Sequence, residues 1–362
     1  MPQLIMVSHR QAVVIWIIFN TGKRSDKMKY RQRLIAISLL SGLTQSVLAS
    51  SSDTDIRVAV RAHSGEQQAI KKWSPTIDYL IQTLPQYNFV MLPYTSLKQQ
   101  LADAKAGRFH FLLTNPATYV ELEVSIGAKA ILTLINNRRG SAQTRFGSVI
   151  FTHVDHTDIL KIEDLKGKDF MAVSPLGFGG WRVGSKILKA HGIDPETDFA
   201  SLNFAGKQPR VVEAIRDKKA HAGMVRTDML ERLADKGKLN LRNVRILNQQ
   251  STPGFPFFHS TPLYPEWPFV AMPHTSAELT EQVKQALLKL TRTDPAAQAG
   301  KYMGWTPALD YQPVKALLRD LGVAPYAEQK PGLQIFYLLF GLSALLVVFY
   351  AFKRYSVKRV GS

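Results

Sequence analysis

The stretch that most constrains this chain is residues 169–192, DFMAVSPLGFGGWRVGSKILKAHG. Its apolar run at 170–173 is typical of a short buried strand, and breakers follow at once. The loop after it contains a serine and three glycines: Ser174, Gly177, Gly179 and Gly180. From Trp181 the apolar residues take helical spacing, which stops at Gly192. A strand, a glycine loop and a helix start direct backbone N–H groups at one point, which favours an anion; a plain tight turn is the alternative.

Two nucleotide-binding fingerprints fail on this stretch. The dinucleotide motif needs a third glycine at the sixth position, which is Arg182 when counted from Gly177. The P-loop needs Gly-Lys-Ser/Thr, but from Gly179 the chain gives Gly184-Ser185-Lys186, in reversed order and already inside the helix.

The charge of the chain does not point to nucleic acid. The formal net charge of +18 is by itself typical of a nucleic-acid partner. However, residues 1–49 hold seven Lys and Arg against one acid, and residues 353–362 hold four against none. The rest carries +8 over 303 residues without a dense basic run. Much of the excess therefore belongs to segments of the kind that flank membranes.

The N-terminal region predicts export. Residues 28–49 combine a basic start, an apolar stretch over 34–43 and a small-residue end, the pattern of a secretory signal peptide cleaved after Ala49. Residues 1–27 are then expected to be an over-extended start. The chain has no cysteine, which excludes disulfides, thiolate metal sites and cysteine nucleophiles.

From residue 55 onward, strand patterns alternate with helical ones. Strands are expected over 56–60, 89–92, 109–113, 147–151, 170–173, 199–204 and 222–225, with a return strand in 260–272. Helices are expected over 67–84, 96–106, from Ala117, and over 209–218, 227–236, 277–292 and 311–321. Such alternation predicts parallel, doubly wound sheets, whose ligands lie beyond the carboxyl ends of the strands.

The chain is expected to cross twice between two lobes, near 147–152 and 260–270. Lobe 1 then covers about 55–146 and 271–325, and lobe 2 covers about 153–259. Both belong to a predicted binding domain of residues 50–331.

The segment 333–352 contains twenty residues without a charge. At helical rise it spans about 30 Å, the thickness of the hydrocarbon core of a bilayer. Four basic residues in 353–362 follow it, which places this tail in the cytoplasm. The sequence therefore predicts a single-pass protein of the bacterial inner membrane, with its binding domain in the periplasm.

Four motifs in sequence order carry a family resemblance: LLTNPATYVEL (112–122), FGSVIFTHVD (146–155), DLKGKDFMAV with FGG (164–173 and 178–180) and STPLYPEWPF (260–269). Over roughly residues 55–325 the chain resembles the periplasmic phosphate/phosphonate-binding (PhnD-like) solute-binding proteins. It resembles still more closely the sensor domains of tetrathionate-sensing (TtrS-like) histidine kinases. The resemblance implies an α/β, type II periplasmic binding protein fold that closes on a small oxyanion.

The resemblance also implies ligand-binding positions. The matching ones are Thr114, Asn115 and Tyr119 in the TNP-x-x-Y motif, and Ser174, Gly177, Phe178, Gly179 and Gly180 in the glycine loop. Because ten residues follow residue 352, the resemblance is to the sensor without the kinase half. The absence of cysteine removes thiol chemistry with a sulfur oxyanion.

Strand-to-helix junctions supply candidates with alternatives. Thr114 and Asn115 can contact a ligand at the start of a helix, or simply cap that helix. Arg61, just past the first strand, can offer a bidentate guanidinium to an oxyanion or lie solvated on the surface. Arg226 and Thr227 occupy the corresponding junction in lobe 2.

Other patterns point away from catalysis and metals. The aromatic residues near these loops, Tyr119, Phe178 and Trp181, can line a pocket or belong to the core. The motif His153-x-Asp155-His156 lies in a polar turn without the helical i, i+4 pair, so we expect no metal. The sequence has no nucleophile elbow and no evident carboxylate pair, so we expect neither an enzyme nor a cofactor.

Together these features predict a membrane-anchored periplasmic binding or sensor protein for a small oxyanion: phosphate, a phosphonate or a sulfur oxyanion. The leading reading is the sensory part of a two-component system, with a separate histidine kinase as partner. An anchored substrate-binding component of a phosphate/phosphonate-type ABC transporter is the alternative, with a permease as partner. A remnant of a split sensor kinase, and a homodimer, also remain open.

Overall fold

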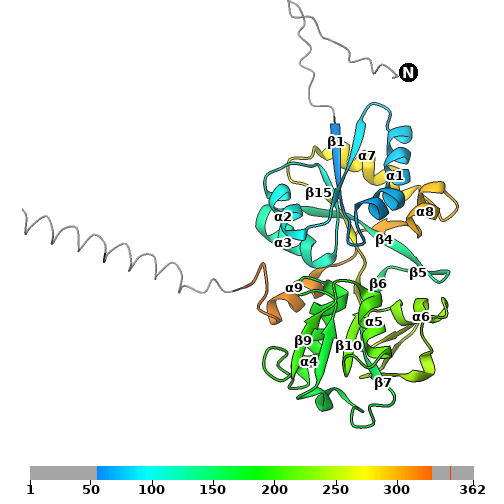
Figure 1. Cartoon of the computed structure of the whole chain (residues 1–362). Helices are drawn as coiled ribbons and strands as arrows, with labels where there is room; N and C mark the ends of the chain where they lie inside the picture. Colours follow the sequence, from blue (N-terminus) through cyan, green and yellow to red (C-terminus); the bar gives the residue numbers. More distant parts are fainter. Residues whose placement is uncertain (1–54, 328–342, 344–362) are drawn as a thin grey trace, which may run out of the picture. The chain divides into compact units, whose positions relative to one another are not determined.

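A computed structural model describes residues 55–327 and Ser343. In this region the strands form two main sheets, one in each of two lobes (Figure 1). The predicted signal peptide lies outside the described residues, as does the apolar segment 333–352 apart from Ser343. Within the described part of the chain, no helix combines the length and apolar character needed to cross a bilayer.

Lobe 1 is built on a seven-stranded sheet of order β16-β4-β15-β3-β1-β2, with β5 paired to β4. Its strands are β1 (Asp55–Arg61), β2 (Asn88–Tyr94), β3 (Phe111–Leu113), β4 (Lys129–Arg138), β5 (Ser141–Gln143), β15 (Pro268–Ala271) and β16 (Tyr302–Pro307). Its helices are α1 (Glu66–Thr83), α2 (Leu97–Lys105), α3 (Pro116–Ile126), α7 (Ala277–Leu288), α8 (Pro295–Gly300) and α9 (Gln312–Asp320). Val58 and Val60 of β1 lie in one core with α1 and α7, whereas Ala59 lies in another with α3 and α9. Helices therefore cover both faces of this sheet, because successive side chains of a strand point to opposite faces.

Lobe 2 repeats this layering on a five-stranded sheet of order β11-β7-β10-β8-β9. Its strands are β7 (Ser148–His153), β8 (Asp169–Ala172), β9 (Ser201–Phe204), β10 (Ala222–Arg226) and β11 (Val244–Leu247), with a separate hairpin of β12 (Gln250–Thr252) and β13 (Phe255–His259). Its helices are η1 (Ile162–Leu165), η2 (Phe178–Arg182), α4 (Val183–Ala190), α5 (Gln208–Arg216), α6 (Met229–Ala234) and η3 (Leu241–Asn243). Met224 of β10 shares a core with Leu188 of α4, and its neighbour Val225 shares another with Val211 of α5.

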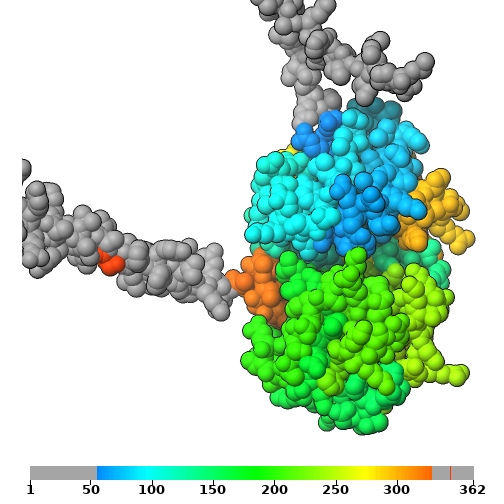
Figure 2. Space-filling model, in the orientation of Figure 1, coloured from blue at the N-terminus to red at the C-terminus, as the bar shows by residue number. Residues whose placement is uncertain are grey.

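The two segments that join the lobes lie side by side. The short strand β6 (Arg145–Phe146) pairs antiparallel with β14 (Tyr264–Pro265). The backbone N–H of Glu266 donates to the carbonyl of Thr144, and that of Ser260 to the carbonyl of Ser148, both at 2.8 Å. The crossovers thus lie at 144–148 and 260–266, close to the expected positions. Figure 2 shows lobe 1 (blue to cyan) in contact with lobe 2 (green), with α9 (orange) at one end of the boundary.

The expectation of parallel sheets holds for only part of each sheet. β1 pairs parallel with β2 and β3, and β8 pairs parallel with β9 and β10. In contrast, β15 is antiparallel to β3 and β4, because it returns from lobe 2 and enters the sheet from the opposite end. Several elements lie where the sequence suggested none, among them β4, β5, β11, β12, β13, β16 and α8.

Candidate functional site

The strand ends of lobe 1 bring several candidate residues to one edge of the sheet. Arg61 of β1 pairs with Tyr94 of β2, and Leu113 of β3 pairs with both Val60 and Phe269. Arg61, Thr114 and Trp267 therefore share the edge that faces the crossovers. Lobe 2 contributes its own strand ends there, since β10 ends at Arg226, which pairs with Ser148 at the start of β7.

The predicted side chains of lobe 1 are engaged within that lobe. Arg61 donates through Nη1 to the backbone carbonyl of Tyr94 at 2.8 Å and to that of Thr95, and burial lowers its pKa. The hydroxyl of Thr114 is fully buried and donates to Oε1 of Gln100 at 3.0 Å. In this structure neither group points freely at a ligand.

Asn115 and Tyr119 are placed by helix α3. The Asn115 side chain accepts hydrogen bonds from the backbone N–H groups of Ala117 and Thr118 at 3.0 and 3.1 Å, as an N-cap does. The Tyr119 ring contacts the Tyr311 ring edge-on at 5.0 Å, and burial raises the pKa of its hydroxyl to about 12. Asn115 thus caps helix α3 and Tyr119 packs in the core. The sequence left both roles open as alternatives to ligand contact.

The glycine loop lies next to Arg226 and the first crossover. A Cβ on Gly179 would lie 2.7 Å from the Phe146 ring and 3.4 Å from Cβ of Arg226. A Cβ on Gly180 would lie 2.6 Å from Val173 and 3.2 Å from Nε2 of Gln208. The loop leads directly into η2, which continues into α4 without a gap. The helical segment therefore begins at Phe178, three residues before the expected start at Trp181. The glycines therefore permit close packing of the protein itself, while the first N–H groups of this helix start lack intrahelical acceptors.

Gly179→Ala should destabilise the fold, because a methyl group there has no room beside Phe146. Overpacking of this kind typically costs about 1–3 kcal/mol, so the melting temperature of the full chain should fall by several degrees. An unchanged thermal unfolding curve would show that Phe146 yields freely and that packing does not explain this glycine.

The other predicted lobe 2 residues lie at the same boundary. Phe178 is buried between the rings of Phe146 and Tyr264, at 5.7 and 5.5 Å, in edge-on contacts. Thr227 donates its backbone N–H to the carbonyl of Gly147 at 3.1 Å and accepts at Oγ1 from the N–H of Gly147 at 3.3 Å. Ser174 is half-buried, and its carbonyl accepts from the N–H of Gly177 at 2.9 Å in the turn of the loop.

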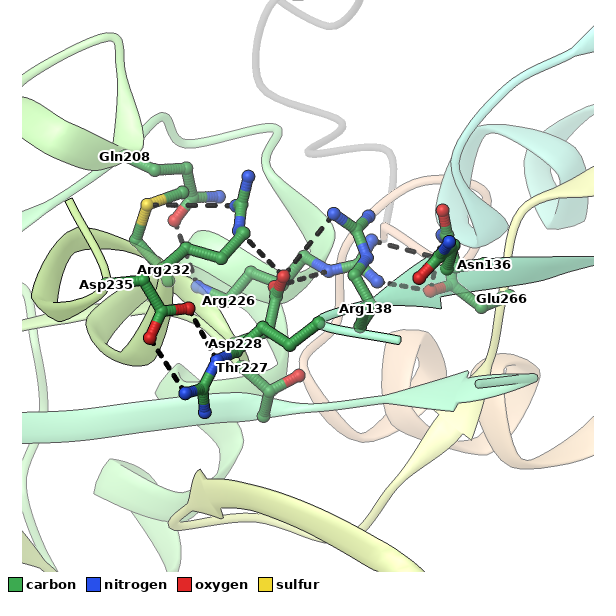
Figure 3. Close-up of polar contacts among 12 residues, drawn as sticks. Asn136, Arg138, Gln208, Arg226, Thr227, Asp228, Arg232, Asp235 and Glu266 are labelled. Carbon is green, nitrogen blue, oxygen red and sulfur yellow. Dashed lines mark hydrogen bonds and ion pairs between the residues drawn. The ribbon is translucent and has the colours of Figure 1, made fainter. Parts of the chain in front are cut away.

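A buried ionic cluster between the lobes was largely missed by sequence reasoning (Figure 3). Arg226 pairs through Nη2 with Oε1 of Glu266, whose side chain has no exposed surface. The same carboxylate accepts from Asn136 of β4 at 2.7 Å. Desolvation alone would raise the pKa of Glu266, but the charges of Arg226 and Arg138 and these hydrogen bonds hold it below its ordinary value. Glu266 is therefore ionised and bridges the two lobes.

Asp228 is the second acid of the cluster. It lies 2.7 Å from Nε of Arg232, 3.4 Å from Nη1 of Arg138 and 3.9 Å from Nε of Arg226, and its side chain is 2% exposed. Its backbone is in the left-handed region, with φ of 72°. Such strain in a residue other than glycine concentrates at functional sites.

The cationic cluster extends to α1 and the loop before it. Lys72 is half-buried, with Nζ 4.5 Å from the centre of the Trp73 ring, and desolvation, followed by the charge of Arg138, lowers its pKa to about 7. His63 stays open to solvent but is surrounded closely enough that desolvation, then the charge of Lys72, lowers its pKa to about 4. Its ring contacts that of Trp267 at 5.5 Å. At neutral pH, His63 adds no charge to the cluster.

Two signals in the sequence could have located this cluster. Glu266 is the single acid within the apolar motif STPLYPEWPF, and an acid in a buried strand needs a partner. Arg138 ends the segment KAILTLINNR, whose apolar residues and length are typical of a strand, although no strand was expected there. Lys72 carries no such signal, because a lysine on an amphipathic helix is ordinarily on its solvated face.

A pocket in lobe 2 lies at the opposite end of β7 from the ionic cluster. It has a volume of about 480 Å³, and its lining includes His153, Arg216, Lys238 and Asn240. No residue of the ionic cluster lines it. His153 Nδ1 is 3.5 Å from Asp155, but within residues 55–327 and at Ser343 no three His, Cys, Asp or Glu side chains are grouped to hold a metal.

Comparisons with known proteins agree with this architecture. Residues 58–312 match the family model described as ABC transporter, phosphonate, periplasmic substrate-binding protein. The tetrathionate sensor histidine kinase TtrS of Salmonella typhimurium is 33% identical over 270 residues, which are 74% of this chain. The match covers 44% of that kinase, so this chain spans less than half of the curated relative.

Solved structures share the fold at low sequence identity. PhnD1 from Prochlorococcus marinus, solved with methylphosphonate, aligns with a TM-score of 0.57 at 14% identity, over 74% of this chain and 98% of that one. A binding protein component of a phosphonate ABC transporter from Pseudomonas aeruginosa aligns with a TM-score of 0.57 at 15% identity, over 82% of this chain and 98% of that one. A Xanthomonas citri protein bound to ATP aligns with a TM-score of 0.60 at 16% identity, over 74% of this chain and 98% of that one.

Proposed function

This chain belongs to the family of periplasmic substrate-binding proteins of phosphonate ABC transporters, and on that premise we propose that it binds a small oxyanion between its lobes. Its fold is that of a periplasmic binding protein, and it is a binding protein rather than an enzyme. In the type II form of this fold, two crossovers allow the lobes to close on a ligand. The paired segments β6 and β14 are suited to that hinge.

The observation that carries the proposal is the uncompensated positive charge between the lobes. Four cationic side chains, Lys72, Arg138, Arg226 and Arg232, meet two carboxylates, Asp228 and Glu266. In the described structure, Nε of Arg138 and Nε of Arg226 are buried without a hydrogen-bond acceptor. A buried N–H group without an acceptor is costly, and an oxyanion would supply acceptors to these two Nε atoms and negative charge together.

The class of ligand follows from this charge and from the relatives. PhnD1 was solved with methylphosphonate, and TtrS is named as a tetrathionate sensor. We therefore propose a phosphonate, phosphate or a sulfur oxyanion. The glycine loop, with Ser174 and the N–H groups from Phe178 onward, lies beside Arg226 and would complete the site. Thr114 and Asn115 would line its other side only after their present hydrogen bonds rearrange.

For the output, we propose a sensory role at the bacterial inner membrane. The identity to TtrS supports it, as does the uncharged segment 333–352, which would anchor the periplasmic domain. The family description supports the second candidate, an anchored substrate-binding component of an importer. Crosslinking of the full chain in native membranes separates the two: capture of a histidine kinase supports sensing, and capture of an ABC permease supports import.

Arg138→Met should weaken oxyanion binding, because it removes one of the cationic groups that face the boundary from lobe 1. Hydrogen bonds between charged groups contribute about 1.5–3 kcal/mol each, so affinity should fall at least about tenfold. Calorimetry of the full chain in mild detergent, with methylphosphonate, phosphate, thiosulfate and tetrathionate, measures the loss.

The matched control is Arg216→Met, which removes a cation from the lobe 2 pocket. It should leave every affinity unchanged. If Arg216→Met abolishes binding while Arg138→Met does not, the ligand lies in the lobe 2 pocket and the proposed site is wrong.

A further inference from the structure

We infer that the pocket at the far end of lobe 2 is a second ligand site, which takes a small monocarboxylate with an apolar body, such as an aromatic acid. Its volume of about 480 Å³ lies within the range of about 300–1,000 Å³ typical of small-molecule sites. Strand β7 separates the pocket from the boundary between the lobes, since it begins at Ser148 beside the crossovers and ends at His153, which lines the pocket. The pocket and the ionic cluster have no residue in common.

The floor of the pocket is apolar. Phe151 and His153 point to the same face of the sheet, because side chains alternate along β7. On that face Phe151 belongs to one core with Ile215, near the end of α5, and Leu239, and all three side chains are buried. Such a floor favours a ligand with an aromatic or aliphatic body, because contact with it removes apolar surface from water. A compact oxyanion such as phosphate has no apolar surface to bury there.

His153 presents a hydrogen-bond donor to the pocket. The residue is 8% exposed, and its Nδ1 accepts from the backbone N–H of Asp155 at 3.2 Å. The Asp155 carboxylate lies 3.5 Å from the same nitrogen but pairs with Nζ of Lys218. In the neutral imidazole the nitrogen that does not accept carries the proton, which is Nε2 here. Within residues 55–327 Nε2 has no hydrogen-bond partner, so its N–H is available to a ligand.

The rim of the pocket supplies an unpaired positive charge. Arg216 donates to Oδ1 of Asp217 at 2.7 Å and to the carbonyl of Lys238 at 3.1 Å, so its guanidinium forms part of the wall. Lys238 is exposed, and within the described part of the chain no acid pairs with its Nζ. No acid is among the described residues that line the pocket. A free ammonium and an N–H donor beside one apolar floor are suited to a carboxylate on an apolar body.

Calorimetry of the full chain in lipid nanodiscs, with benzoate as the probe, tests this ligand class. Benzoate should bind with a dissociation constant below about 1 mM, which is modest for a ligand of its size. Benzamide has the same shape without the charge, and acetate has the charge without the ring, so each should bind at least about tenfold more weakly. Benzoate that does not bind at ten times that concentration, or that binds no better than both analogues, would overturn the inference.

Variants locate the bound probe. His153→Leu removes the donor to the carboxylate and should weaken benzoate at least about tenfold. Lys238→Met should weaken it about two- to fivefold, as expected for an exposed charge, and should leave benzamide unchanged. Lys236→Met, which removes an exposed cation outside the pocket, is the matched control and should have no effect.

Asn243→Trp blocks the pocket without touching His153. Asn243 is exposed on the rim, so the melting temperature should not change, whereas the indole should fill the mouth and abolish benzoate binding. Wild-type benzoate affinity in both Asn243→Trp and His153→Leu would show that the probe binds elsewhere and would overturn the inference.

Arg138→Met separates this site from the oxyanion site. It should leave benzoate affinity unchanged, and saturating methylphosphonate should not displace benzoate. If methylphosphonate displaces benzoate and Arg138→Met weakens both, the probe binds between the lobes; the second site is then wrong, whereas the proposed function stands. If no oxyanion binds but benzoate responds to His153→Leu and Asn243→Trp, the second site stands and the proposed function fails.

Discussion

Glu266→Gln should destabilise the protein by about 3–5 kcal/mol at pH 7, the range found when one partner of a buried ion pair is removed. Glu266 has no exposed side-chain surface and pairs with Arg226 across the crossover. Its loss leaves Arg226 and Arg138 near each other without that carboxylate. Denaturant unfolding of the full chain measures the change, and Glu281→Gln, which removes an exposed acid paired with Lys284, is the control with little expected effect.

The pH dependence of this loss has a definite sign. The folded-state pKa of Glu266 is lowered, so its stabilising contribution is present above the unfolded pKa of about 4.3 and is lost as the pH falls through the folded value. The difference in the free energy of unfolding between wild type and Glu266→Gln should therefore be largest near neutral pH and should decrease below about pH 4. A gap that stays constant from pH 7 to pH 3 would mean that the carboxylate charge is not what stabilises the boundary.

Lys72→Met should change stability in the opposite direction. The pKa of Lys72 is lowered to about 7 in the folded protein, against about 10.4 in an unfolded chain. Below pH 7 the lysine is charged in both states, and the full unfavourable contribution of burying it is present; above about pH 10.4 that contribution is gone. The variant should thus be more stable than wild type by up to about 4–5 kcal/mol at pH 6, with no gain near pH 10.5.

Lys71→Met, on the solvent side of the same helix, should leave the free energy of unfolding unchanged. A Lys72→Met protein that is less stable than wild type at pH 6 would contradict the account of an uncompensated ammonium.

Much of the architecture could be read from the sequence because local patterns determine it. The alternation around Val58–Val60 and the helical spacing of α1 each reflect burial on a face, which the printed residues carry. Strand direction could not be read in the same way. Whether β15 runs parallel or antiparallel depends on which lobe the chain returns from, and that is a property of the crossovers.

The site was less predictable, because its residues come together only through tertiary structure. The strand-to-helix junction drew attention to Arg226 and Thr227, but their partners Glu266 and Gly147 are distant in sequence. The glycine loop suggests backbone that a ligand can approach. At Gly179, however, the Phe146 ring occupies the space that a side chain would need. A missing side chain looks the same in a sequence whether a ligand or the protein itself occupies the space.

The central claim is that an oxyanion binds between the lobes at Arg138 and Arg226. Anomalous diffraction from crystals of the protein saturated with selenate, a divalent tetrahedral oxyanion, locates the anion directly. The account predicts a selenium peak within hydrogen-bonding distance of both guanidinium groups. A peak at Arg216 and Lys238 in the lobe 2 pocket, with none between the arginines, would contradict it.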